Sequence, residues 1–143
     1  MLKSRLLVII QFTGIILFAI SGPLTASSFW LQMMELIGVI LAAWAFLVMN
    51  PLRVSVFPEP RPDGELIERG PYAYIRHPMY SSILLIVAAL TIDRLDAASI
   101  ILFLVLATNQ VVKLRFEESL LKAKYSGYEA YMKRTKALIP FVF

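Results

Sequence analysis

The segment with the densest set of side chains able to do chemistry runs from Gly70 to Tyr80, with the sequence Gly-Pro-Tyr-Ala-Tyr-Ile-Arg-His-Pro-Met-Tyr. It contains the only histidine of the chain and three of its six tyrosines. Imidazole, guanidinium and phenol groups can all hydrogen-bond to a polar ligand and orient it. The same residue types also anchor helices at a membrane surface, and residue type alone favours that structural interpretation.

A second cluster lies at residues 113–118, Lys-Leu-Arg-Phe-Glu-Glu. Helical spacing places Glu117 on the same face as Leu114 and Leu121. A carboxylate on an apolar face is costly unless something compensates its charge, so Glu117 is a candidate for ligand binding. A salt bridge to Lys113, four residues earlier, is the alternative.

The next residue, Glu118, points to a different face of the same predicted helix. We expect it to form an ordinary surface pair with Lys122 at i+4 and to be structural. The apolar face itself predicts an amphipathic C-terminal helix, lined by Leu114, Leu121, Tyr125, Tyr128 and Met132.

Four apolar blocks provide the elements that must position these clusters. The chain is 59% hydrophobic and only 17% charged, against about 25% charged in soluble domains. Each block can cross a bilayer as a helix, and the last two, separated by residues 93–96, read as a tight helical hairpin. The first block also resembles a signal peptide, although a retained helix is the simpler interpretation. The blocks are 6–20, 31–49, 78–92 and 97–112.

The basic residues predict an orientation in the membrane. Of the fourteen Lys and Arg, only Arg94 falls on the side opposite to the two termini. Positive charge collects on the cytoplasmic side, so both termini are expected there. We attribute the net charge of +4 to basic residues that flank the membrane helices and set their orientation, and we expect no nucleic-acid partner. The absence of cysteine excludes disulfides and thiolate–metal sites.

The proline-rich segment between the second and third blocks, residues 51–77, has two readings. Prolines at positions 58, 60 and 62 impose an extended path. The segment is either a stiff linker at the cytoplasmic surface or a loop that covers a site at the membrane face.

The order of these motifs resembles the isoprenylcysteine carboxyl methyltransferase and phospholipid methyltransferase superfamily. That superfamily has a G-x-Y-x-x-x-R-H-P-x-Y string, then a helical hairpin, a Glu-Glu pair, an aromatic-rich helix and a proline. Here these correspond to Gly70–Tyr80, Glu117-Glu118, the tyrosines 125, 128 and 131, and Pro140. The resemblance covers residues 64 to 140, about half of the chain.

The resemblance implies a pocket for S-adenosylmethionine built without a Rossmann sheet, and no G-x-G occurs in the chain. No metal is implied. A basic residue four positions before the Glu pair is assigned to substrate in the family. Lys113 stands there in place of the usual Arg, so Lys113 and Arg115 are the candidates for orienting the acceptor. By motif position the cofactor contacts would come from Leu66, Ile67, Tyr72, Arg76, His77, Pro78, Met79, Tyr80, Glu117 and Glu118.

The sequence thus predicts an all-α integral membrane bundle of about four transmembrane helices, with a C-terminal hairpin and an amphipathic cytoplasmic helix. Residues 1–50 would form two helices, and residues 51–143 the methyltransferase domain. The predicted reaction is methyl transfer from S-adenosylmethionine to a lipophilic small molecule or lipid. A sterol-reductase-like enzyme that uses a nicotinamide cofactor and a non-enzymatic membrane protein remain alternatives. Oligomeric state is not predicted.

Overall fold

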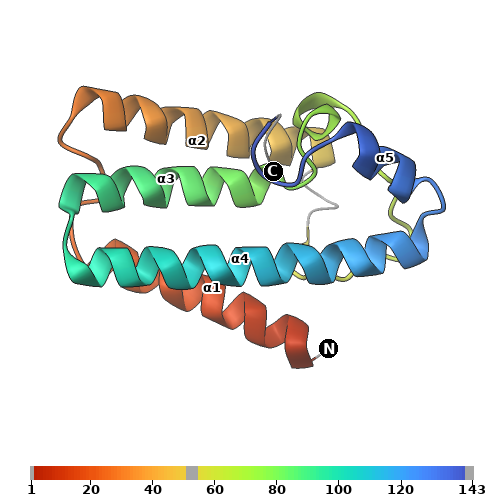
Figure 1. The fold of residues 1–143 in the computed structure, drawn as a ribbon, viewed down its shortest axis with the longest axis horizontal. Coiled ribbons are helices and arrows are strands. Elements are labelled where there is room, and N and C mark those ends of the chain that lie inside the picture. The colour runs from red at the N-terminus through yellow and green to blue at the C-terminus, as the bar shows by residue number, and fades with distance from the viewer. Residues whose placement is uncertain (1, 51–54, 141–143) are drawn as a thin grey trace.

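The computed structural model describes residues 2–50 and 55–140, which form an all-helical bundle (Figure 1). Within these residues the only β-type pairing is an isolated parallel bridge between Ile75 and Lys136. The predicted all-α class is therefore confirmed for the described chain. Its elements are α1 Leu2–Ile20, α2 Phe29–Met49, the 3-10 helix η1 Gly70–Ala73, α3 Pro78–Arg94, α4 Ala97–Lys124 and α5 Tyr128–Arg134.

Three of the helices, α1, α2 and α4, are long and apolar enough to cross a membrane. The helix α3 has 17 residues and lies between α2 and α4 (Figure 1). Most of α2 turns apolar side chains outward, among them Ile37 and Ile40, each more than half exposed. Outward-facing apolar side chains are expected on a helix whose outer surface contacts lipid.

Two glycines allow the helices to pack closely. At Gly38 in α2 an added Cβ would lie 2.6 Å from Ile86 Cγ1 and 3.2 Å from the Ser82 carbonyl oxygen of α3. At Gly14 in α1 it would lie 2.7 Å from Leu106 Cδ2 of α4. Small residues at such crossings let membrane helices approach each other, because packing rather than the hydrophobic effect holds them together.

The end of the bundle at the α3–α4 connection is fixed by polar side chains. Leu95 adopts a left-handed conformation with φ of 48°, and the Asp96 side chain caps α4 by accepting from the Ser99 N–H at 2.9 Å. The Arg94 guanidinium donates to the carbonyl oxygens of Phe18 and Pro23, in α1 and the segment after it. These bonds tie the start of the α1–α2 connection to the end of α3.

The helix α4 is longer than its apolar block, which was predicted to end at Val112. Residues 113–124 contain no glycine or proline and continue the helix to Lys124. The charged cluster at 113–118 therefore lies inside α4 and not at its end. The predicted continuous apolar face is also wrong beyond Leu121, because the chain is extended at Tyr125 before the short α5 begins.

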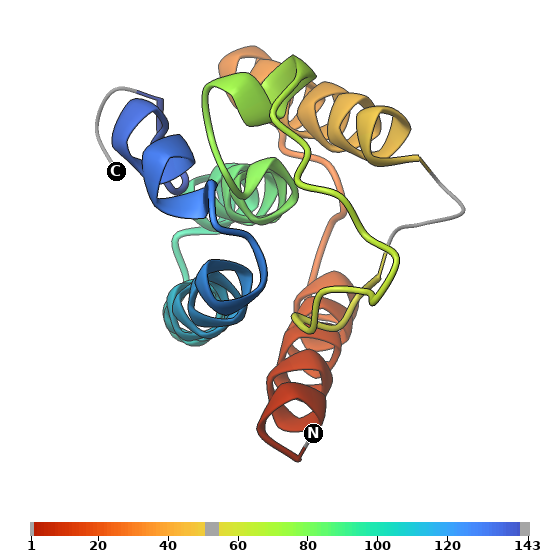
Figure 2. The ribbon, with the colours of Figure 1, turned by 90° about the vertical axis from the view of Figure 1, so that its right-hand side faces the viewer.

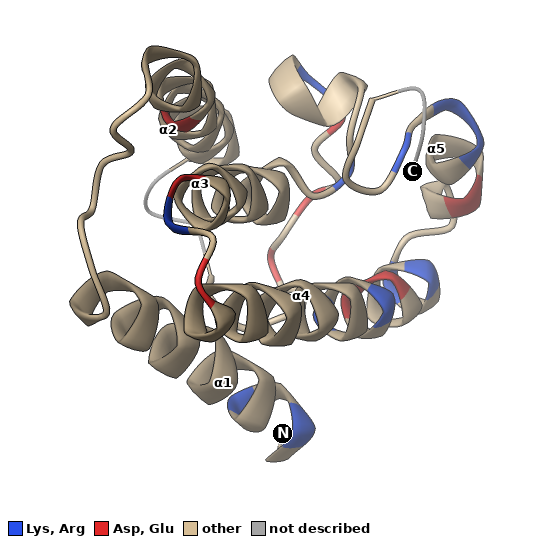
Figure 3. Ribbon diagram, turned by 60° about the vertical axis from the view of Figure 1, so that its left-hand side comes forward, with Lys and Arg blue, Asp and Glu red and all other residues tan. Residues whose placement is uncertain are grey.

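Charged side chains gather at the two ends of the bundle (Figure 3). Lys and Arg concentrate near the N-terminus of α1, the end of α4 and α5, whereas long stretches of α1, α2 and α4 carry none. The opposite end carries the small group Asp93, Arg94 and Asp96. An uncharged middle between polar ends is the distribution that a bilayer imposes.

Candidate functional site

A cavity of about 370 Å³ lies where α3 begins, at the end of the bundle that holds α5. Its wall is built from the last residues of α2, the segment 55–69, η1, the start of α3, and the adjoining parts of α4 and α5. We call residues 55–69 the roof segment, which crosses this end of the molecule between α1 and η1 (Figure 2). Of the residues predicted from the sequence, the wall includes Leu66, Ile67, Tyr72, Arg76, His77, Pro78, Met79, Tyr80 and Glu117.

The string from Gly70 to Tyr80 enters the cavity through a tight turn. Gly70 has φ of +61°, and an added Cβ there would lie 2.7 Å from Val48 Cγ2 of α2. Both the backbone conformation and the close approach of α2 therefore require glycine. The Tyr72 carbonyl oxygen of η1 accepts a hydrogen bond from Tyr131 Oη at 2.6 Å, which joins η1 to α5.

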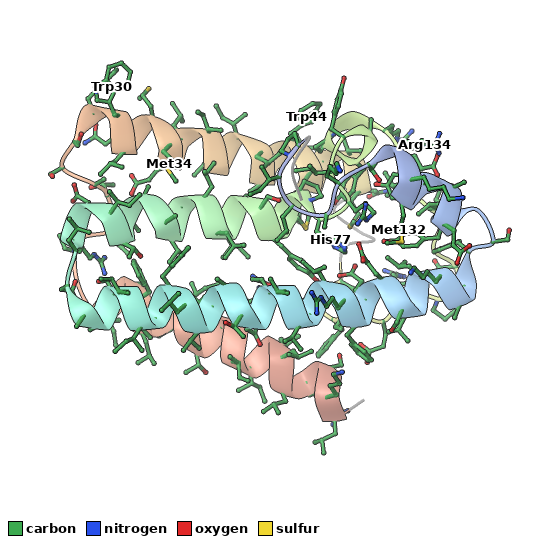
Figure 4. The ribbon with its side chains drawn as sticks, viewed as in Figure 1. Trp30, Met34, Trp44, His77, Met132 and Arg134 are labelled. Atoms are coloured by element: carbon green, nitrogen blue, oxygen red, sulfur yellow. The ribbon has the colours of Figure 1, made fainter. Side chains whose placement is uncertain are left out.

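His77 is held by the backbone of the C-terminal segment. Its N–H donates to the Ala137 carbonyl oxygen at 3.1 Å, and the Arg76 N–H donates to the Lys136 carbonyl oxygen at 2.8 Å. Pro78 follows at the first position of α3, where a missing N–H costs no helical bond. The His77 side chain lies at the start of α3, on the side toward α4 (Figure 4).

A buried charge cluster joins Arg76 and His77 of the cavity wall to Glu118 behind it. Arg76 Nε donates to Glu118 Oε1 at 2.6 Å, and Arg76 Nη1 donates to the Thr135 carbonyl oxygen at 2.6 Å. His77 Nε2 lies 3.3 Å from the same Glu118 oxygen. Because a carboxylate can only accept, this contact places a proton on Nε2.

Glu118 is therefore not the surface residue that we expected. It is 9% exposed and its carboxylate pairs with Arg76 and His77, the two residues just before α3, rather than with Lys122 in an exposed i+4 pair. The expectation failed because it considered only neighbours on the same helix, whereas α3 packs against this face of α4. Glu118 supports the wall but does not line the described cavity.

Glu117 does line the cavity. Its Oε2 accepts a hydrogen bond from Tyr80 Oη at 2.5 Å and lies 3.7 Å from His77 Nδ1. The rings of His77 and Tyr80 are stacked, with centroids 5.2 Å apart. This arrangement presents a carboxylate and two stacked rings to the same space, a combination suited to a ligand that carries hydroxyl or amino donors and positive charge.

The two basic candidates on α4 lie apart from the described cavity wall. Lys113 is 2% exposed, and its Nζ donates to Gln11 Oε1 of α1 at 2.7 Å instead of forming the alternative salt bridge with Glu117. The same ammonium lies 5.0 Å from the centroid of the Tyr80 ring. Arg115 is exposed. The Tyr80 ring thus separates Lys113 from the cavity, and the exposed Arg115 side chain is turned away from it.

The roof segment is fastened to the bundle at several points. Tyr125 Oη donates to the Gly64 carbonyl oxygen at 2.7 Å, and Lys124 Nζ donates to the carbonyl oxygens of Arg61 and Pro62. From α1, Ser4 Oγ donates to Glu59 Oε2 at 2.6 Å. Of the two readings of this segment, the described residues fit a loop that covers a site.

Three tyrosines that sequence reasoning did not assign to the site also line the cavity, namely Tyr125, Tyr128 and Tyr131. Burial raises the pKa of Tyr131 and of Tyr72, so both phenols stay protonated and can donate hydrogen bonds. The signal for the three was their spacing of three residues. Helical spacing placed Tyr125 and Tyr128 on the face that carries Glu117, and all three residues line the cavity. The break after Lys124, which separates α4 from α5, was not predicted.

Comparison with known proteins identifies the family of the chain. No curated protein matches the chain. The family model of the phospholipid methyltransferases, however, matches residues 9–127, which include the greater part of α1, the helices α2 to α4 and most of the cavity wall. The match extends well beyond half of the chain. The chain therefore belongs to the phospholipid methyltransferase family.

Proposed function

We propose that the protein is an integral membrane methyltransferase that uses S-adenosylmethionine to methylate a lipophilic acceptor, in the manner of the isoprenylcysteine carboxyl methyltransferases. The observation that carries the proposal is the cavity lined together by the Gly70–Tyr80 string and Glu117, at the polar end of an apolar bundle. Family membership supports the reaction class over that of a nicotinamide-dependent reductase.

The residues of the cavity fit this cofactor. A volume of about 370 Å³ lies within the range of roughly 300–1,000 Å³ of small-molecule sites. Glu117 offers an acceptor for ribose hydroxyls or an amino group, held in place by Tyr80. Aromatic faces from Tyr80 and Tyr125 line the same space and favour a sulfonium cation. Leu66, Ile67 and Met79 provide apolar surface.

The chemistry asks little of the protein beyond alignment. Bound S-adenosylmethionine supplies an activated methyl group, whose bond to sulfur breaks as the bond to the acceptor forms, leaving S-adenosylhomocysteine. The chain's own residues then have three tasks. They bind the donor, orient the acceptor in line with the methyl group, and exclude water from the cavity. The roof segment, with Pro58 fully buried, suits the last task.

The proposed architecture places the acceptor in the bilayer. We propose four membrane spans, with α3 and α4 as a hairpin, both termini on the cytoplasmic side, and residues 51–143 as the methyltransferase domain after two N-terminal helices. The cofactor then enters from the cytoplasm, while the acceptor approaches from the lipid. Of the two basic candidates, we assign the orientation of the acceptor to Lys113, whose ammonium lies against the Tyr80 ring, and not to Arg115, which is exposed and turned from the cavity.

The test is transfer of a labelled methyl group. Membranes that contain the protein are incubated with methyl-tritiated S-adenosylmethionine and extracted with organic solvent. We expect label in the organic phase above that of membranes without the protein, and about tenfold less with Glu117→Gln. Label that stays in the aqueous phase would contradict a lipophilic acceptor.

A further inference from the structure

The search for further ligand-binding groups leads to Tyr128, the first residue of α5. Its side chain is 1% exposed and is one of the largest fully buried side chains among the described residues. The residue lines the cavity, yet its hydroxyl has no hydrogen-bond partner among the described residues. A buried polar group without a partner is costly and calls for an explanation.

The neighbouring tyrosine shows that the local structure can satisfy such a group. Tyr131 lies in the same short helix and packs edge-on against Tyr128, with ring centroids 5.7 Å apart. Its hydroxyl is also buried, but it donates to the Tyr72 carbonyl oxygen at 2.6 Å. The two phenols therefore share one environment, and only one of them has its partner within the described chain.

The charges around Tyr128 indicate which kind of partner it takes. Burial raises the pKa of the Tyr128 phenol most, and the carboxylates of Glu118 and Glu117 raise it further. The Arg76 guanidinium acts in the opposite direction and lowers this pKa. The hydroxyl therefore remains protonated and is available as a donor. The Arg76 guanidinium is already paired with Glu118, so no uncommitted positive charge there would receive an anionic group.

We propose that Tyr128 is a cofactor-binding residue whose hydroxyl donates to an uncharged acceptor of the nucleoside part of the ligand, a ribose oxygen or an adenine nitrogen. This inference rests on the proposed function. Occupation of the cavity supplies the partner that the described residues lack, so the hydroxyl costs stability in the free protein and adds affinity in the complex. A hydroxyl with a purely structural role would instead stabilise the free protein, so that its removal would lower the melting temperature.

The test compares three tyrosine-to-phenylalanine variants in detergent. Without ligand, Tyr128→Phe should melt at the same temperature as the native chain or up to about 3 °C higher, because it removes an unpaired buried group. Tyr131→Phe should melt lower, because it removes a satisfied hydrogen bond. Tyr74→Phe, at an exposed side chain outside the cavity wall, should match the native chain.

Affinity for S-adenosylhomocysteine is the second readout. We expect a loss of about threefold to tenfold for Tyr128→Phe and none for Tyr74→Phe. Competition with 5′-methylthioadenosine, which lacks the amino-acid part, should show the same loss. A loss confined to S-adenosylhomocysteine would overturn the nucleoside assignment.

The outcomes separate this inference from the proposed function. If the native chain binds S-adenosylhomocysteine and Tyr128→Phe binds it equally well, the inference fails and the proposed function stands. A fall in the melting temperature of Tyr128→Phe as large as that of Tyr131→Phe would also overturn it, since the hydroxyl would then have a partner in the free protein. A native chain that binds no S-adenosylhomocysteine would contradict the proposed function itself.

Discussion

At the scale of single residues, the two adjacent glutamates differ in their surroundings. Glu117 faces the cavity with its carboxylate bonded to Tyr80, whereas Glu118 is buried between Arg76 and His77. A step of about 100° per residue along a helix separates the two faces. Substitution of Glu117 should therefore change ligand binding, and substitution of Glu118 should change the stability of the fold.

Replacement of Glu118 by glutamine should destabilise the free protein. The Arg76 side chain is 9% exposed and would lose its carboxylate partner among the described residues, leaving a buried cation without compensation. Breaking such a pair costs about 3 kcal/mol of unfolding free energy. Thermal or denaturant unfolding in detergent measures the loss. A variant as stable as the native chain would show that Arg76 and Glu118 do not depend on each other.

Replacement of Glu117 by glutamine should weaken the binding of S-adenosylhomocysteine and leave the unfolding free energy nearly unchanged. Loss of a charge-assisted hydrogen bond, worth about 1.5–3 kcal/mol, corresponds to about a tenfold to hundredfold lower affinity. Titration calorimetry on the folded variant measures it. Equal affinity for the variant and the native chain would remove Glu117 from the site.

At the scale of helices, the crossing of α2 and α3 depends on Gly38. Valine at this position would place its Cβ within 2.6 Å of Ile86 Cγ1 and against the Ser82 carbonyl oxygen. The two helices would have to separate, at a cost of about 1–3 kcal/mol of unfolding free energy. Since α2 also contributes Val48 and Met49 to the cavity wall, we expect the variant to bind S-adenosylhomocysteine less tightly.

The control for this variant is Gly127→Ala, because a Cβ at Gly127 meets nothing within 4 Å. Gly127 is the N-cap of the short helix α5, where the change from glycine to alanine costs at most about 1 kcal/mol. Melting curves of both variants, measured in one detergent, give the comparison. A melting temperature for Gly38→Val equal to that of the control would mean that α2 and α3 do not pack at this point.

At the scale of the whole molecule, the charge distribution predicts the orientation in the membrane. The chain has no cysteine, so single cysteines can be introduced and labelled from one side. We expect Pro60→Cys, in the roof segment, and Leu95→Cys, in the α3–α4 connection, to react from opposite sides, with position 60 cytoplasmic. Reaction of both from the same side would contradict the four-span arrangement.

The starts of the helices α3 and α4 were predictable, and their ends were not. Pro78 and Ala97 begin α3 and α4 as expected, because a proline and a cap residue mark them in the sequence. The end of α4 was missed by twelve residues, since a helix does not stop where its apolar block stops. Contact between residues distant in the chain was also unpredictable. The pair Arg76–Glu118 depends on how α3 sits along α4.

Within the site, the motif string was recognisable and its supports were not. The string from Gly70 to Tyr80 has its residue types in a fixed order, so it can be recognised as a family motif from the sequence alone. The hydrogen bond from Tyr125 to Gly64 and the Tyr128 hydroxyl, which has no partner among the described residues, lie next to the break between α4 and α5. Helical periodicity correctly placed Tyr125 and Tyr128 on the face of Glu117, which lines the cavity with them. It assumes a continuous helix, however, and could not predict the break after Lys124.

The most direct test of the central claim, that the cavity beneath the roof segment holds S-adenosylmethionine, is calorimetric titration of the purified, detergent-solubilised chain with S-adenosylhomocysteine. We predict saturable binding at one site per chain and no saturable binding of NADPH under the same conditions. Absence of S-adenosylhomocysteine binding by the folded native chain, or saturable binding of NADPH in its place, would contradict the account.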